Sequence, residues 1–518
     1  MRRGRDIEDG LLPGQQAASR AAACAPARPP LKAPPPIERN ATGRRWAALG
    51  LGKPAATGSA PSQRHDADAG GLSGEPADRP QAAGLPGKRA GRLRDWLSGS
   101  TARKGALSLT DQAVVSGASF FTTVLVGRVC GPGELGIYSL GLTIVLLLTS
   151  MHLALVSMPY TVFGNRLTGS RRAEYAGAVL VHHLGLTLLV MLGLAAGAAA
   201  VSAATGFPGL SRVMWVLSAL AGFILLREFS RRFAFAQLDM GTALTLDLVI
   251  AALQVAGLLG LMALGELSAA GALAALGAAC GVAGLVWLGM AGRSFAVRWR
   301  QVLPELRRNW LFGRWVLAGS ITFVLHGYSI YWLIALLLGA EATGILAACM
   351  TVVMFFNPVL VAVGNLVIPQ NARAFAAEGP AGVRRVVAKA TLLLLSAMAL
   401  YCGLVVLAGE RVVQWLYHNP AYAGHGQLID VLALGMLAAV LGTAADSGLC
   451  ALERPDLNFK ANLLGLTATV AVTSLLLVPW GVLGAACGLL AGNTTASLAR
   501  VGAFLRAARP IQTGVAGA

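Results

Sequence analysis

From residue 107 onward the chain is a succession of long apolar runs separated by short polar connections. Each run is close to the ~20 residues that a helix needs to cross the hydrocarbon core of a bilayer. The pattern therefore predicts twelve transmembrane helices, of which the fourth is short. They cover residues 107–127, 136–158, 176–202, 213–226, 244–264, 268–290, 315–338, 343–368, 386–408, 428–451, 461–478 and 482–504.

The basic residues in the connections predict the orientation, because cytoplasmic loops of membrane proteins are enriched in Lys and Arg. The connections after the odd-numbered helices contain only Arg128, Arg212 and Arg411. The connections after the even-numbered helices contain many more, and residues 293–314 are especially rich in arginine. We therefore expect both termini to lie in the cytoplasm.

The composition excludes a soluble enzyme. Hydrophobic residues make up 55% of the 518 residues and charged residues 13%, with a mean hydropathy of +0.63, whereas a soluble chain carries about 25% charged residues. The net charge is +18, and 18 of the 42 basic residues lie in an N-terminal segment rich in Pro, Ala and Gly that lacks apolar periodicity. We expect this segment, residues 1–105, to be a disordered cytoplasmic tail that faces anionic lipid rather than nucleic acid.

A repeated pattern divides the predicted helices into two halves. Residues 133–140 (GELGIYSL) align with residues 341–348 (EATGILAA), so that Gly136 matches Gly344 at an offset of 344 − 136 = 208 residues. Six helices separate the copies, so both have the same orientation. We expect two pseudo-symmetric six-helix bundles with a site between them. The boundaries are an N-terminal bundle at 106–292, a basic cytoplasmic connection at 293–314, a C-terminal bundle at 315–508 and a tail at 509–518.

Several short motifs carry a family resemblance. They are Asp111-Gln112 with residues 128–138 (RVCGPGELGIY), residues 451–456 (ALERPD) with Asn462, and residues 480–486 (WGVLGAA). Over residues 106–506 the chain resembles the bacterial polysaccharide exporters, which are oligosaccharide flippases of the multidrug/oligosaccharidyl-lipid/polysaccharide superfamily.

The resemblance implies movement of a polyprenyl-linked oligosaccharide from the inner to the outer leaflet of the bacterial cytoplasmic (inner) membrane. It implies membrane lipid, glycan-assembly glycosyltransferases and a polymerase as partners. No cofactor or metal is expected, because the seven cysteines show no metal-binding spacing.

A flippase breaks no bond and instead needs a polar path for a head group, which should appear as polar stripes on apolar helices. Such stripes occur on predicted helices 1, 2, 7 and 8, although Ser and Thr stripes also pack membrane helices together or bond to their own backbone. The candidate path residues are Gln112, Ser116, Ser119, Thr123, Arg128, Thr143, Thr322, His326, Ser329, Asn357 and Asn365.

His326 is the most distinctive of these residues, because it lies near the middle of predicted helix 7. A neutral imidazole is tolerated there and gains a proton when an anionic group approaches, but a neutral hydrogen-bonded histidine between helices fits equally well. Asp111, Asp247 and Asp446 are candidate ion-coupling carboxylates, and the alternative is solvation at the cytoplasmic interface. No Lys or Arg stands at the centre of a predicted helix.

Two other functions remain open. An ion-coupled multidrug exporter of the same superfamily should have acidic residues deep in the helices and an aromatic pocket. A membrane polysaccharide polymerase or ligase should have a large external loop or a soluble catalytic domain. The longest predicted external connection, at 409–427, contains few titratable residues, which makes an acid/base pair there a weak hypothesis.

Overall fold

The computed structural model describes residues 100–204 and 207–509, and within these ranges the chain is almost entirely helical, without strands. The predicted all-α membrane architecture is confirmed at this level. The tail predicted at residues 1–105 falls largely outside the described residues, as do residues 510–518. Where the description begins, Ser100 is already helical.

The N-terminal half contains six long helices, which we call the N-lobe. The second of them continues as π-helical turns on either side of Pro159. The helices are α4 (Ser100–Val129), α5 (Gly131–His152), α6 (Gly169–Ala204), α7 (Pro208–Ala236), α8 (Met240–Ala263) and α9 (Ala269–Ala291).

The C-terminal half, which we call the C-lobe, contains fewer but longer helices: α10 (Trp299–Val353), α11 (Asn357–Tyr417), α12 (Gly426–Ala451) and α13 (Pro455–Ala507). Three of them are interrupted by a glycine in the left-handed region: Gly339 in α10, Gly379 in α11 and Gly481 in α13, with φ of 89°, 61° and 57°. Such φ values are strained for any residue with a Cβ, so glycine allows these sharp reversals. In the described residues, nine helical stretches are long and apolar enough to cross a membrane, and two of these contain the three breaks.

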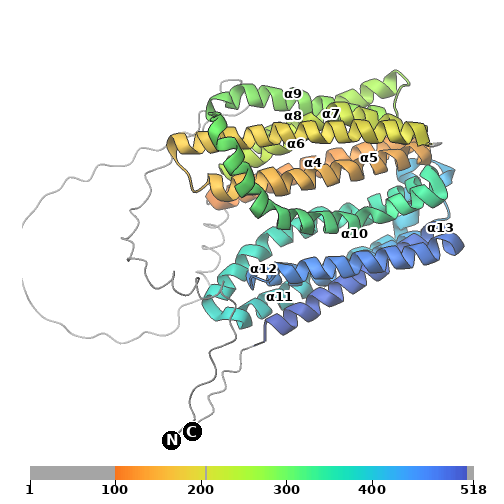
Figure 1. Cartoon of the computed structure of the whole chain (residues 1–518). Helices are drawn as coiled ribbons and strands as arrows, with labels where there is room; N and C mark the ends of the chain where they lie inside the picture. Colours follow the sequence, from red (N-terminus) through yellow and green to blue (C-terminus); the bar gives the residue numbers. More distant parts are fainter. Residues whose placement is uncertain (1–99, 205–206, 510–518) are drawn as a thin grey trace, which may run out of the picture.

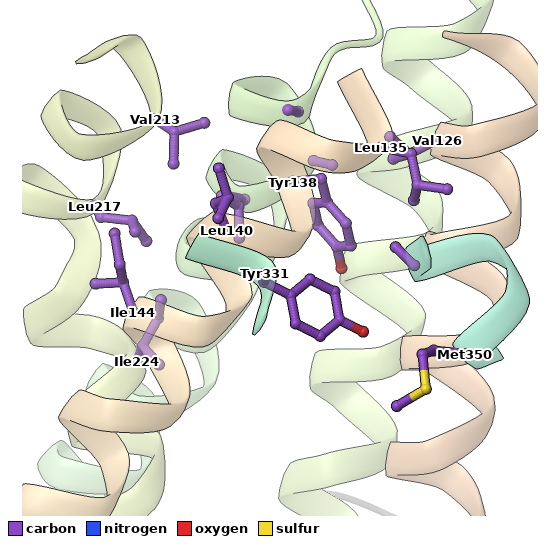
Figure 2. Close-up of a cluster of buried hydrophobic side chains, with 14 of the residues drawn as sticks. Val126, Leu135, Tyr138, Leu140, Ile144, Val213, Leu217, Ile224, Tyr331 and Met350 are labelled. Atoms are coloured by element: carbon purple, nitrogen blue, oxygen red, sulfur yellow. The ribbon is translucent and has the colours of Figure 1, made fainter. Parts of the chain in front are cut away.

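The lobes meet along α5 and α10. Figure 1 shows α4 to α9 on one side of the molecule and α11 to α13 on the other, with α10 between them. One hydrophobic cluster spans the boundary, and Figure 2 shows Tyr138 of α5 close to Tyr331 of α10 inside it. Within a membrane, close van der Waals packing of such side chains stabilises the contact.

The two glycines of the sequence repeat lie at this boundary. A Cβ on Gly136 would stand 1.9 Å from the carbonyl oxygen of Ala340, and a Cβ on Gly344 would stand 1.8 Å from that of Pro132. Pro132 and Ala340 are themselves 340 − 132 = 208 residues apart. The two contacts are therefore the same contact made twice, which is how two related units meet across a twofold axis.

Replacing Gly136 by Ala is expected to destabilise the protein, because the new methyl group meets backbone rather than a movable side chain. Overpacking of this kind costs about 1–3 kcal/mol. The measurement is the thermal melting temperature of the purified protein in detergent. Gly117→Ala is the matched control, since Gly117 lies in α4 with nothing within 4 Å of its Cβ position. An equal melting temperature for both variants would contradict the close contact.

Candidate functional site

Two arginines one helical turn apart connect α7 to α4 and α8. The guanidinium of Arg231 lies 2.5 Å from a carboxylate oxygen of Asp111 in α4 and 2.7 Å from one of Asp247 in α8. Arg227 donates to the other oxygen of Asp247 at 2.9 Å. We call these four residues the N-lobe ion cluster.

The cluster is buried, and its two aspartates balance its two arginines, although Arg227 also lies 3.6 Å from Glu228, which is 15% exposed. Asp111 and Asp247 are each 2% exposed, and the two arginine side chains are 15% and 14% exposed. A buried charge without a partner costs several kcal/mol. The two carboxylates are tolerated here because the two guanidinium groups neutralise them, and the guanidinium groups are tolerated for the same reason. The cluster ties three helices of the N-lobe together at the level where α7 approaches its end.

The polar contact between α4 and α8 extends further along both helices. The side-chain amide of Gln254 donates to the hydroxyl of Thr122 at 2.9 Å, and both residues are buried. Thr122 in turn donates to the carbonyl oxygen of Ala118. This interhelical bond joins the two helices independently of the charged cluster.

A second polar cluster lies in the C-lobe. Arg500 of α13 donates to the side-chain oxygen of Asn462 in the first half of the same helix and interacts electrostatically with Asp446 of α12. His326 of α10 also interacts with Arg500 and packs so closely on Gly465 that a Cβ there would lie 2.7 Å from the ring. We call His326, Asp446, Asn462 and Arg500 the C-lobe cluster.

The C-lobe cluster contains two buried nitrogens that no hydrogen bond or ion pair satisfies among the described residues. Nε2 of His326 and Nε of Arg500 are buried and make no hydrogen bond within the described residues. Its charges are one arginine and one aspartate, without a direct ion pair between them among the described contacts. A buried polar nitrogen without a partner costs free energy, so these two nitrogens are candidate contacts for a polar ligand.

The two clusters occupy corresponding places. Asp247 is the eighth residue of α8 and Asn462 the eighth of α13, and their separation of 462 − 247 = 215 residues equals the separation of Asp446 from Arg231, 446 − 231 = 215. The same helix positions thus carry polar side chains in both halves. In the C-lobe, Asp446 stands where the N-lobe has Arg231, and Asn462 stands where it has Asp247.

The path residues predicted on α4 and α5 are partly engaged with their own helices. Gln112 donates to Ser116 at 3.3 Å, and the hydroxyls of Thr123 and Thr143 donate to backbone carbonyl oxygens one turn back. Thr143 also accepts a bond of 2.8 Å from the indole of Trp332 in α10, across the lobe boundary. Ser119 and Arg128 are exposed.

The path residues predicted on α10 and α11 are more varied. Thr322 bonds to its own backbone, whereas the hydroxyl of Ser329 is buried without a partner in the described residues. Asn357 is exposed at the start of α11, directly after the 3-10 turn η4 (Met354–Phe356). Asn365 lies in α11, and its side chain is outside the described residues.

Comparison with family models and with curated proteins finds no match. Comparison with solved structures finds similar folds. A lipid II flippase, MurJ, in an inward closed conformation gives a TM-score of 0.64 at 10% identity, covering 79% of this chain and 90% of that one. An inward-facing multidrug resistance MATE family transporter of the MOP superfamily gives 0.61 at 14%, covering 77% and 93%. A MOP superfamily transporter from Pyrococcus furiosus, described as having a binding pocket of reverse polarity, gives 0.58 at 14%, covering 78% and 94%.

The chain has the fold of the MOP superfamily transporters. It is a multi-pass membrane protein, because its apolar helices and its structural neighbours agree on that point. At 10–14% identity the likeness extends to the fold alone.

Within this MOP fold, sequence reasoning overlooked the arginines of both clusters. It ended the fourth helix at Leu226 because Arg227 follows, whereas α7 continues through ten further residues to Ala236. A hydropathy pattern treats arginine as the end of a span, but an arginine that meets an aspartate on a neighbouring helix remains inside the bundle. The sequence did contain a signal for this cluster. Two arginines spaced i, i+4 follow the fourth apolar run, and Asp111 and Asp247 lie near the predicted cytoplasmic ends of two other runs.

Proposed function

We propose that this MOP-fold protein is a flippase that moves a polyprenyl-linked oligosaccharide across the bacterial inner membrane by alternating access. Three groups of short motifs resemble the polysaccharide exporters, and one of the similar structures is a lipid II flippase. A lipid-linked glycan has an anionic head and a hydrocarbon tail, so the protein must supply a polar path while the tail stays in lipid. The glycosyltransferases and polymerase that make and extend such glycans are the proposed partners.

We propose twelve crossings arranged as two related six-helix bundles with both termini in the cytoplasm. The breaks at Gly339 and Gly379 divide the longest helical stretch into three segments, and the break at Gly481 divides α13 into two. When these segments are counted separately, the two breaks in the longest stretch add two spans and the break in α13 adds one, so the nine candidate spans become twelve. The reciprocal contact of Gly136 and Gly344 supports a twofold relation between the halves.

The balance of the N-lobe ion cluster is the observation that favours a flippase over an ion-coupled exporter. Two of the three candidate coupling carboxylates, Asp111 and Asp247, are held by Arg227 and Arg231. A carboxylate that binds and releases a proton or a sodium ion needs a negative charge that is not already neutralised. We therefore propose that these two aspartates hold the N-lobe together, and that any ion coupling falls to Asp446.

The C-lobe cluster is the proposed contact for the anionic head group. Guanidinium and imidazole groups are strong hydrogen-bond donors to phosphate oxygens, and Arg500 and His326 each have a buried nitrogen without an acceptor. Arg500 would supply the partly buried cation that the sequence alone did not indicate. No bond-breaking chemistry is proposed for any of these residues.

An ion-coupled multidrug exporter is the second candidate. The likeness to a MATE transporter favours it, as does Asp446, which forms no direct ion pair among the described residues. Reconstitution in vesicles separates the two. The flippase proposal expects a fluorescent polyprenyl pyrophosphate glycan to become accessible to a membrane-impermeant reductant faster than in protein-free vesicles. Efflux of a cationic dye driven by a proton or sodium gradient, without movement of the glycolipid, would instead support the exporter.

A further inference from the structure

The first part of α10, residues 299–315, differs from every other long helix of the molecule in direction. In Figure 1 it runs across the ends of the other helices, from the end of α9 toward the C-lobe, before α10 turns to run alongside them. We call this segment the linker helix. It contains a proline, Pro304, within its first turns.

One face of the linker helix is fixed to the N-lobe by buried polar contacts. Asn309 is 1% exposed and accepts a hydrogen bond of 2.9 Å from the hydroxyl of Tyr175 in α6. His182 of α6 lies 2.8 Å from the carbonyl oxygen of Val302. Just before the helix, Arg298 forms an ion pair of 2.9 Å with Glu174.

A neighbouring side of the linker helix is exposed and strongly apolar. Trp299, Leu303, Leu306 and Trp310 follow an i, i+4, i+7, i+11 spacing, which places them on one stripe of a helix with 3.6 residues per turn. Their exposed fractions are 74%, 72%, 43% and 49%. Leu303, Leu306 and Trp310 border a shallow groove of about 710 Å³.

A row of arginines runs beside this stripe. Arg300, Arg307 and Arg314 recur every seven residues, all are exposed, and none has a carboxylate partner among the described ion pairs. Arg308, in contrast, points back to the protein, where its guanidinium lies 4.1 Å from the ring centre of Phe163. The linker helix thus presents tryptophan and leucine on one stripe and unpaired positive charge on the next.

We infer that the linker helix lies in the membrane interface and binds anionic phospholipid. Trp299 and Trp310 reach the boundary between head groups and acyl chains, while Arg300, Arg307 and Arg314 bind lipid phosphates. Amphipathic helices of this composition bind the surface of anionic bilayers. A bilayer is the favoured occupant because the same helix continues into a membrane-spanning segment. The chain's own N-terminal segment is a poor alternative, because it is itself basic and the arginines of the linker helix would repel it.

Brominated lipids test this inference, because they quench tryptophan fluorescence only at short range. The full-length protein is placed in nanodiscs that contain brominated phosphatidylglycerol or brominated phosphatidylcholine at equal mole fraction. We expect stronger quenching by the anionic lipid, and we expect the double variant W299F/W310F to lose that excess. The triple variant R300Q/R307Q/R314Q should reduce the preference by about fivefold per arginine removed.

The triple variant R171Q/R373Q/R384Q is the matched control, because it removes the same charge from exposed positions on other connections. It should keep the excess quenching. Equal quenching by the two lipids in the unmodified protein would overturn the inference, as would an unchanged excess in W299F/W310F. An L303C variant tests the alternative occupant. If two copies of it form a disulfide and the brominated lipids do not quench, the occupant is a second copy of the chain and the inference is overturned.

Discussion

Replacing Arg231 by Gln is expected to reduce the amount of folded protein in the membrane severely. Arg231 contacts both Asp111 and Asp247, so its loss leaves two buried carboxylates with Arg227 as their one remaining cation within the cluster. Removing one partner of a buried ion pair costs about 3–5 kcal/mol, which is comparable to the stability of many whole domains. The measurement is the monodisperse fraction of a fluorescently tagged protein after extraction in mild detergent.

Two further variants separate the loss of charge balance from the loss of the side chain itself. R212Q is the matched control, since Arg212 is exposed near the start of the same helix, α7. The double variant D111N/R231Q removes one charge of each sign and leaves the pair of Arg227 and Asp247 intact, so it should recover much of the folded fraction. Full stability of R231Q alone, or a double variant less stable than R231Q, would show that the cluster is not held together by its charge balance.

The pattern of apolar runs predicted the helical membrane architecture well, because a bilayer imposes the same length on every crossing. Eight of the twelve predicted runs fall inside one observed helix. Runs 244–264 and 268–290 each extend one residue beyond α8 and α9, run 136–158 continues from α5 into π-helical turns, and run 343–368 spans the end of α10, the 3-10 turn η4 and the start of α11. The extension of α7 was missed for a physical reason. Hydropathy scores a residue by itself, whereas the free energy of burying Arg227 depends on Asp247, twenty residues later in the chain.

The repeat at Gly136 and Gly344 was visible in the sequence, but its role was not. The alignment suggested two related halves, and the structure adds that the two glycines touch each other's helices. The candidate polar path was harder to predict, because a Ser or Thr on a helix can bond to its own backbone as readily as it faces a ligand. Thr123, Thr143 and Thr322 all do so. What distinguishes His326 and Ser329 is the absence of a partner among the described residues, which no spacing rule reveals.

Replacing His326 by Ala is expected to lower glycan export about tenfold or more while leaving the amount of protein in the membrane unchanged. A hydrogen bond to a charged group contributes about 1.5–3 kcal/mol, and each 1.4 kcal/mol corresponds to a tenfold change. His326 is 5% exposed, and its Nε2 makes no bond in the described structure that a smaller residue would break. The measurement is surface polysaccharide in cells whose own copy of the gene has been deleted.

The variants S329A and H326Q show whether the histidine acts on the substrate or only fills space. Ser329 lies one turn along α10 and also has a buried polar atom without a partner, so S329A tests whether any loss of a polar atom on this face lowers export. Glutamine keeps a neutral donor of similar reach but cannot become cationic, so H326Q should export less than the unmodified protein if the imidazole takes up a proton beside the anionic head. If H326Q and H326A both export normally, His326 does not belong to the substrate path, and the head group must be sought nearer Arg500 alone.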